Sequence, residues 1–271
     1  MKRLVINADD FGFTRDVNDG IVEAHRRGIL TATTLMANGG AFEDAVRLAR
    51  ENPALDVGCH LVLVSGASVA DPNRRLPVTV GGMLRAIVSR RLRPFEELRA
   101  QVLRITGAGI RPTHLDTHKH THLFPPVLNA VAKISREFGI PWVRRPFDFP
   151  LNGSAARPPL SVRLTSRCLG IVRGRFHRTL DAHGCRTTDH FAGFQITGHV
   201  GVEEIVQLIR KLPEGLTEFM CHPGRCGPEL MKARTRLKES RERELHALTA
   251  PEVRDALDRA GVELVAYRDL L

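Results

Sequence analysis

Short apolar runs alternate with longer segments of helical periodicity along the chain. The short runs, several rich in Val, Ile and Leu, are typical of buried strands, whereas the longer segments space apolar residues as amphipathic helices do. Strands are predicted at residues 4–8, 31–36, 56–63, 142–143, 191–196, 217–221 and 263–266, with another short extended segment in the histidine-rich stretch from residue 114. Helices are predicted at residues 17–27, 42–50, 82–91, 94–106, 125–138, 202–211, 228–248 and 251–260. This alternation, without a glycine-rich dinucleotide fingerprint, predicts a single α/β domain over residues 1–271 that closes into a (β/α) barrel.

Polar side chains that suit catalysis follow several of the predicted strands. Asp9 and Asp10 end the first strand, and His60 lies near the end of the third. Asn38 and His222 follow two others. Taken singly, either aspartate could cap the next helix and His60 could be an ordinary buried histidine. The carboxyl ends of parallel strands meet on one barrel face, so polar residues from several strands predict a shared site there.

Four histidines and one aspartate crowd residues 114–122 (HLDTHKHTH). Alternate side chains of a strand share a face, so His118, His120 and His122 would form one imidazole surface, with Asp116 nearby. A carboxylate and two imidazoles around a divalent ion leave room for water and a substrate oxygen. Such an ion acidifies the water and polarises a carbonyl. The cluster predicts a metal site or an acid–base centre without specifying its ligands.

The cysteines and the apolar runs point to a cytoplasmic protein. Five cysteines, odd in number and unevenly spread, do not form a disulfide framework. Cys59 and Cys221 precede histidines of the predicted rim and are expected to face the packed layer behind it. The apolar run at the amino end is too short for a signal peptide, and no run approaches the ~20 residues of a membrane span.

The formal net charge of +10 favours contact with polyanions. Nucleic acid is not the expected partner, because the chain has one Trp and one Tyr for stacking on bases and no recognised nucleic-acid-binding pattern. Within the basic segment at residues 145–190, apolar residues recur at roughly helical spacing. This segment is predicted either to lie as an amphipathic helix on an anionic membrane, at its inner face, or to pack on the barrel with solvated arginines. No feature indicates an oligomeric state.

Four blocks of sequence resemble the signature blocks of the YdjC-like carbohydrate deacetylase family. They occur in the family's order at residues 7–12 (NADDFG), 58–61 (GCHL), 113–125 (THLDTHKHTHLFP) and 221–224 (CHPG). The resemblance implies an irregular TIM-like barrel and the removal of acetyl groups from N-acetylated sugars with one divalent metal ion. Magnesium or zinc is expected, and manganese or cobalt would also suit the ligands.

The resemblance also assigns roles by position. It implies that Asp10, His60 and His118 are metal ligands and that Asp9 is the general base. It makes His222 the general acid or the partner of that acid. The remaining residues expected to contact the substrate or support the ligands are Asn38, Asp116, His120 and His122.

The chain is similar to the hopanoid-biosynthesis-associated branch of that family. This similarity implies an N-acetylglucosaminyl lipid as substrate, and a sugar headgroup at a membrane would give the basic segment at residues 145–190 a purpose. Deacetylation of soluble chitooligosaccharides is the alternative, with phosphoester hydrolysis as a further reaction for such a site. A remote alternative is a basic nucleic-acid- or lipid-binding protein in which the histidines are structural.

Overall fold

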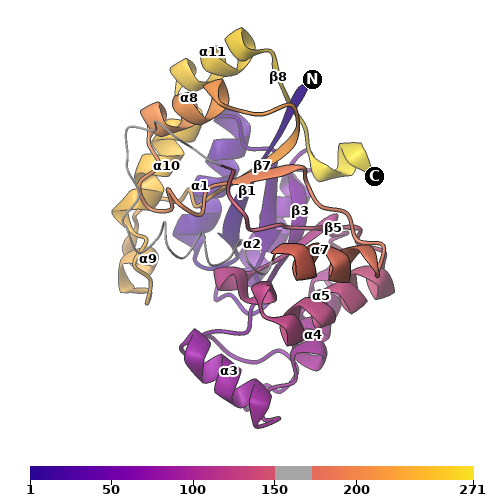
Figure 1. The fold of residues 1–271 in the computed structure, drawn as a ribbon. Helices are drawn as coiled ribbons and strands as arrows, with labels where there is room; N and C mark the ends of the chain where they lie inside the picture. Colours follow the sequence, from indigo (N-terminus) through magenta and orange to yellow (C-terminus); the bar gives the residue numbers. More distant parts are fainter. Residues whose placement is uncertain (150–172) are drawn as a thin grey trace.

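The computed structural model describes residues 1–149 and 173–271, and its strands form one parallel sheet that curls into an irregular barrel (Figure 1). The strands are β1 (Lys2–Phe11), β2 (Ala32–Leu35), β3 (Asp56–Leu61), β4 (His114–Thr117), β5 (Trp142–Val143), β6 (His190–Ala192), β7 (Gly215–Cys221) and β8 (Val262–Leu264). The predicted α/β barrel, a TIM-like fold in one domain, is confirmed.

Helices surround the curled sheet (Figure 1). They are α1 (Arg15–Arg27), α2 (Phe42–Glu51), α3 (Val80–Val88), α4 (Pro94–Gly107), α5 (Pro125–Phe138), α7 (Arg173–Asp181), α8 (Val202–Arg210), α9 (Pro228–Lys232), α10 (Glu239–Thr249) and α11 (Pro251–Ala260), with 3-10 helices η1 (His118–Leu123) and η2 (Tyr267–Leu270). Most bounds lie within a few residues of those predicted, because proline at the start and glycine at the end mark several helices in the sequence. No helix in the described ranges is long and apolar enough to cross a bilayer.

The central strand β1 organises the sheet. The strand order is β5-β4-β3-β2-β1-β7-β6, and β8 pairs with the first residues of β1, whereas β2 pairs with its last residues. All these pairings are parallel, so the strands point their carboxyl ends to one side. The buried positions of β1 run from Leu4 to Phe11 without alternation, as expected for a strand covered on both faces.

The two ends of the sheet meet beyond β5. Asp148 forms a parallel bridge with Phe191 of β6, and the Phe149 amide donates to the Phe191 carbonyl at 2.9 Å. The Asp148 carboxylate also accepts the backbone N–H groups of Phe194 at 3.2 Å and Gln195 at 2.7 Å. This contact ties the β5 side of the barrel to β6.

Stability should depend on pH through Asp148. Burial raises the pKa of Asp148 to about 7, above its usual 3.8. Protonation therefore favours the folded state, and stability is lost as pH rises from about 4 to 7, by at most about 1.4 kcal/mol per unit. We expect Asp148→Asn to flatten this part of the pH–stability curve, as measured by urea unfolding between pH 4 and 8. An unchanged slope would assign the dependence to other groups.

Two expectations about elements need correction, and a third is tested only in part. The predicted helix at residues 228–248 is two helices, α9 and α10, and the break lets α10 begin anew at Glu239 and turn polar side chains inward. The histidine stretch leaves its strand after Thr117, as described below. Much of the predicted basic helix lies outside the described residues, and in the described part Phe176 and Leu180 are buried within the protein.

Candidate functional site

A bulge at the end of β1 turns two consecutive carboxylates toward the barrel opening. The β1–β2 register shifts between Ala8 and Phe11, and Asp10 has a left-handed φ of 71°. In a regular strand Asp9 and Asp10 would point to opposite faces. Such a backbone costs a non-glycine residue about 1–3 kcal/mol and is characteristic of functional sites. Neither aspartate caps α1, because Thr14 does so by accepting the Val17 N–H.

Three side chains, from β1, β3 and the start of η1, converge beside this bulge. The Asp10 Oδ1 atom lies 3.3 Å from His60 Nε2 and 3.5 Å from His118 Nδ1, and these two ring nitrogens are 3.3 Å apart. Bonds of about 2.1 Å at tetrahedral angles would set ligand atoms about 3.4 Å apart. Asp10 Oδ1 is buried without a hydrogen-bond partner among the described residues. The three residues therefore fit a divalent metal ion.

Hydrogen bonds orient His60 for this role. Its Nδ1 atom donates to Asp116 Oδ1 at 2.7 Å, which leaves the Nε2 lone pair directed at the Asp10–His118 pair. Thr34 Oγ1 donates to the other oxygen of Asp116 at 3.1 Å. His118 is the most exposed of the three, with a quarter of its side chain accessible, so the site opens on its side.

A second group of candidate ligands, Asp9, His60 and Asp116, is less suited to a metal. Both of its carboxylates already accept hydrogen bonds from the Arg144 guanidinium, which reaches Asp9 at 2.7 and 2.8 Å and Asp116 at 2.6 Å. Arg144 also donates to Glu218 at 2.7 Å. This fully buried cation therefore balances three buried carboxylates, and sequence reasoning assigned it no role in the site.

Asp9 and His222 face each other, the first ionised and the second neutral. Burial opposes ionisation of Asp9, but Arg144 outweighs it and lowers the pKa of the carboxyl below its usual value. Burial lowers the pKa of His222 to about 4 although Asp9 and Asp10 oppose the shift. The Asp9 carboxylate and the neutral His222 ring stand 4.0 Å apart, so a water molecule or a substrate hydrogen can bridge them.

Helix α10 supplies two buried residues that the sequence did not single out. Arg241 pairs with Asp10 Oδ2, opposite the oxygen that faces the histidines, and its Nη1 has no hydrogen-bond partner within the described ranges. Glu244 accepts the backbone N–H of His222, and burial raises the pKa of this carboxyl to about 7. Both contacts hold the β1 and β7 ends of the site in place.

The expected imidazole surface of His118, His120 and His122 is wrong. The strand ends at Thr117, and Lys119 and His120 then adopt left-handed φ angles of 57° and 51°. Side chains after such a turn no longer alternate as in a strand. His120 contacts the Phe191 and Phe194 rings, whereas His122 donates to the Arg144 carbonyl through Nε2 at 3.0 Å.

This turn makes one stability change predictable. Lys119 is exposed, and its left-handed backbone costs about 1–2 kcal/mol. Glycine would avoid this cost, but the greater freedom of the unfolded chain at a glycine offsets part of the gain. We expect Lys119→Gly to stabilise the protein by up to about 1 kcal/mol in urea unfolding. The matched change Lys133→Gly, at an exposed position inside α5, should cost about 1 kcal/mol. Equal losses in both variants would contradict the conformational argument.

Asn38, another predicted site residue, lies apart from the ion-binding group. Asn38 donates to the carbonyls of Ser65 at 3.3 Å and Ala67 at 3.1 Å, and thus holds the loop after β3. Cys59 and Cys221, which directly precede His60 and His222, are buried. Burial raises the pKa of both thiols, as expected for thiols that face the packed layer.

The chain is similar to known proteins over nearly its full length. The model of the YdjC-like protein family matches residues 3–259. A carbohydrate deacetylase of Brevibacillus brevis is 35% identical over 273 aligned residues that cover 99% of each chain. One of Geobacillus stearothermophilus is 33% identical and covers 98% of this chain and 96% of its own.

Among solved structures, a putative cellobiose-phosphate cleavage protein of Enterococcus faecalis matches with a TM-score of 0.75 and 27% identity, over 99% of this chain and 98% of that one. A lactam utilization protein of Thermus thermophilus matches with a TM-score of 0.53 and 16% identity, over 98% of this chain and 100% of that one, and shares the fold alone.

Proposed function

The chain belongs to the YdjC-like protein family, and from this premise we propose that it removes the acetyl group from an N-acetylated sugar, releasing acetate and a free amine. Its full-length similarity to carbohydrate deacetylases makes it a hydrolase of amide bonds. The observation that carries the proposal is the triangle of Asp10, His60 and His118 beside the ionised Asp9 carboxylate.

A divalent ion held by Asp10, His60 and His118 would polarise the acetamide carbonyl and make water more acidic. Asp9 is placed to take a proton from the attacking water, since its carboxylate is ionised and buried. Arg144 holds both oxygens of this base in one orientation. His222 Nε2, 4.0 Å from Asp9, would carry a proton to the departing amine. Because this ring is neutral at rest, it must first gain the proton that Asp9 removes.

We expect zinc to bind this site more tightly than magnesium. Two imidazoles suit zinc, whereas magnesium prefers oxygen ligands and retains several waters. The separations of 3.3 to 3.5 Å among the three ligand atoms also resemble tetrahedral spacing more than the roughly 3.0 Å of an octahedral site. Manganese and cobalt remain compatible with the same ligands.

We further propose that the sugar is lipid-linked, an N-acetylglucosaminyl hopanoid glycolipid. Similarity of the chain to the hopanoid-associated branch supports this substrate, and the net charge of +10 suits work at an anionic surface. Soluble chitooligosaccharides are the competing substrates.

Acetate release by metal-stripped protein tests the proposal. The protein would receive zinc, magnesium, manganese or cobalt and then either an N-acetylglucosaminyl lipid or chitobiose. We expect release that depends on the added metal and is fastest with the lipid. Faster release from chitobiose would make the soluble sugar the substrate. No release from either with any metal would overturn the deacetylase proposal.

A further inference from the structure

One surface segment combines an unusual charge with exposed apolar side chains. Residues 72–95, here called the α3 segment, contain six arginines and neither aspartate, glutamate nor lysine. They are Arg74, Arg75, Arg85, Arg90, Arg91 and Arg93. Figure 1 shows α3 projecting from the rest of the molecule, on the side away from the two termini.

The segment itself contains no acids that could balance these arginines. Of the six, Arg93 alone has a carboxylate within ion-pair distance in the described part of the chain, namely Glu96 at 3.3 Å. Some exposed arginines elsewhere pair with nearby acids, as Arg47 does with Asp44 and Glu51. The α3 segment therefore carries a local excess of positive charge, beyond a generally arginine-rich composition.

The same segment exposes apolar surface. Val78 and Val88, before and at the end of α3, are 72% and 84% exposed. Gly81, Arg85 and Val88 follow one another at helical spacing and are all exposed, so they share the outer face of α3. Basic residues beside exposed aliphatic ones are typical of surfaces that dock on anionic bilayers.

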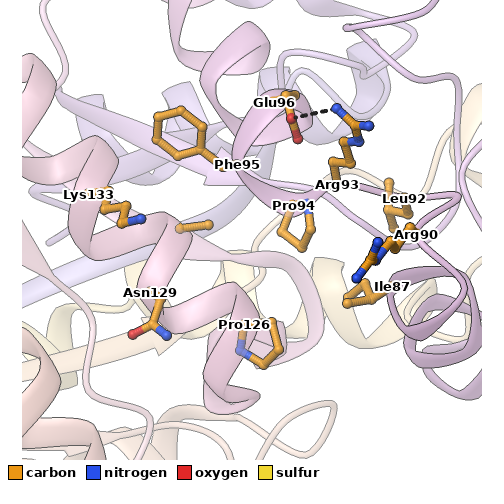
Figure 2. A pocket seen from close by; sticks show the side chains of 11 residues that line it. Ile87, Arg90, Leu92, Arg93, Pro94, Phe95, Glu96, Pro126, Asn129 and Lys133 are labelled. Carbon is orange, nitrogen blue, oxygen red and sulfur yellow. Dashed lines mark hydrogen bonds and ion pairs between the residues drawn. The ribbon is translucent and has the colours of Figure 1, made fainter.

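A cavity at the base of the segment has matching chemistry. It measures about 420 Å³ and lies between the chain after α3 and helix α5 (Figure 2). Arg90 and Arg93 stand on one side and Lys133 of α5 on the other, with apolar walls that include Ile87 and Phe95. Glu96 also lines the cavity and pairs with Arg93, which leaves Arg90 and Lys133 as its cations without an acid partner in the described part of the chain. An anionic headgroup with an adjoining apolar part suits this combination of cations and apolar walls.

We propose that the α3 segment is the surface by which this protein docks on an anionic lipid bilayer. Docking there would turn the candidate site toward the bilayer. The segment follows β3, which carries His60, and α5 begins directly after η1, which carries His118. A benefit of this orientation for catalysis rests on the proposed glycolipid substrate, whereas the docking itself does not.

Vesicle sedimentation tests the docking surface. Vesicles of phosphatidylcholine with phosphatidylserine, or of phosphatidylcholine alone, would be mixed with the whole protein at low and high salt. We expect retention by the anionic vesicles at low salt only. Each cation near an anionic surface contributes about fivefold to partitioning, so Arg85→Gln/Arg90→Gln/Arg91→Gln should weaken retention about 100-fold.

A matched variant separates local charge from net charge. Lys2→Gln/Arg210→Gln/Arg259→Gln also removes three positive charges, around a cavity between α8 and α11 at another part of the molecule. It should retain nearly full vesicle binding. No retention of the wild type, or equal losses in the two triple variants, would overturn the proposed surface.

Two further readouts separate lipid from other polyanions and docking from catalysis. Val78→Ser/Val88→Ser should reduce vesicle retention severalfold and leave binding to duplex DNA unchanged. If the protein binds DNA and the valine variant is retained by vesicles as well as the wild type, the lipid assignment is overturned. Acetate release from chitobiose would be measured for every variant. Docking without acetate release from any substrate would support the proposed docking surface and refute the proposed deacetylase activity. Acetate release without docking would support the activity and refute the surface.

Discussion

Replacing Asp9 with Asn is expected to lower kcat for acetate release by about 10²- to 10⁴-fold, the usual contribution of a general base. The amide cannot accept the proton of the attacking water, although one oxygen can still accept a hydrogen bond from Arg144. Because Asp9 stands outside the triangle of Asp10, His60 and His118, the variant should still bind zinc with a stoichiometry near one. Steady-state kinetics with metal analysis of the same sample measures both effects.

The adjacent change Asp10→Asn is the matched control. It also replaces one carboxylate with an amide, but here the carboxylate is the group that completes the triangle, and a neutral amide oxygen is a weaker metal ligand than a charged carboxylate oxygen. Zinc affinity should therefore fall, and excess zinc should restore part of the activity. If Asp9→Asn loses its metal as readily as Asp10→Asn, the assignment of base and ligand between these two residues is wrong.

Replacing Arg144 with Met should destabilise the protein by about 3–5 kcal/mol at pH 7, because it leaves Asp9, Asp116 and Glu218 buried without their shared cation. Urea unfolding measures the loss. The matched change Arg99→Met breaks a half-exposed pair with Glu137 and should cost only about 0–1 kcal/mol. Similar losses in the two variants would show that Arg144 carries no special part of the stability.

The pH dependence should reverse in the same variant. In the wild type, Arg144 outweighs burial and lowers the pKa of Asp9. The ionised Asp9 therefore stabilises the folded protein above about pH 4, and this stabilisation is lost as pH falls further. Burial already raises the pKa values of Asp116 and Glu218 in the wild type, and without the guanidinium it would raise the pKa values of all three carboxyls above their unfolded values. Folding then favours the protonated groups, and Arg144→Met should be more stable near pH 5 than near pH 8. A variant that gains stability toward pH 8 would contradict this account.

The site buries more carboxyl groups than guanidinium groups. Asp9, Asp10 and Asp116 meet two guanidinium groups, and Glu218 and Glu244 add two further buried carboxyls. Burying such groups is costly unless cations compensate them. A divalent ion beside Asp10 would supply the missing charge, so metal binding and stability should be linked.

The sequence by itself determined the alternating architecture and the strand ends from which polar residues emerge. Apolar runs are local in the sequence and are buried in any compact fold. The parallel strands that they predict must end on one barrel face. The structure accordingly brings together Asp10, His60 and His118. The strand ends predicted a shared site, whereas the family resemblance singled out these three residues as its ligands. Arg144 follows a predicted strand directly, so the same rule could have found it.

Tertiary structure alone decided the directions of several side chains. The left-handed residues at Asp10, Lys119 and His120 break the strand periodicity on which face assignments depend, and no local signal marks them. Arg241 and Glu244 lie in a helix whose sequence looks solvated, and they are buried only because Asp10 and His222 lie opposite. Such pairings join residues far apart in the chain, so the folded structure selects them and local sequence patterns do not reveal them.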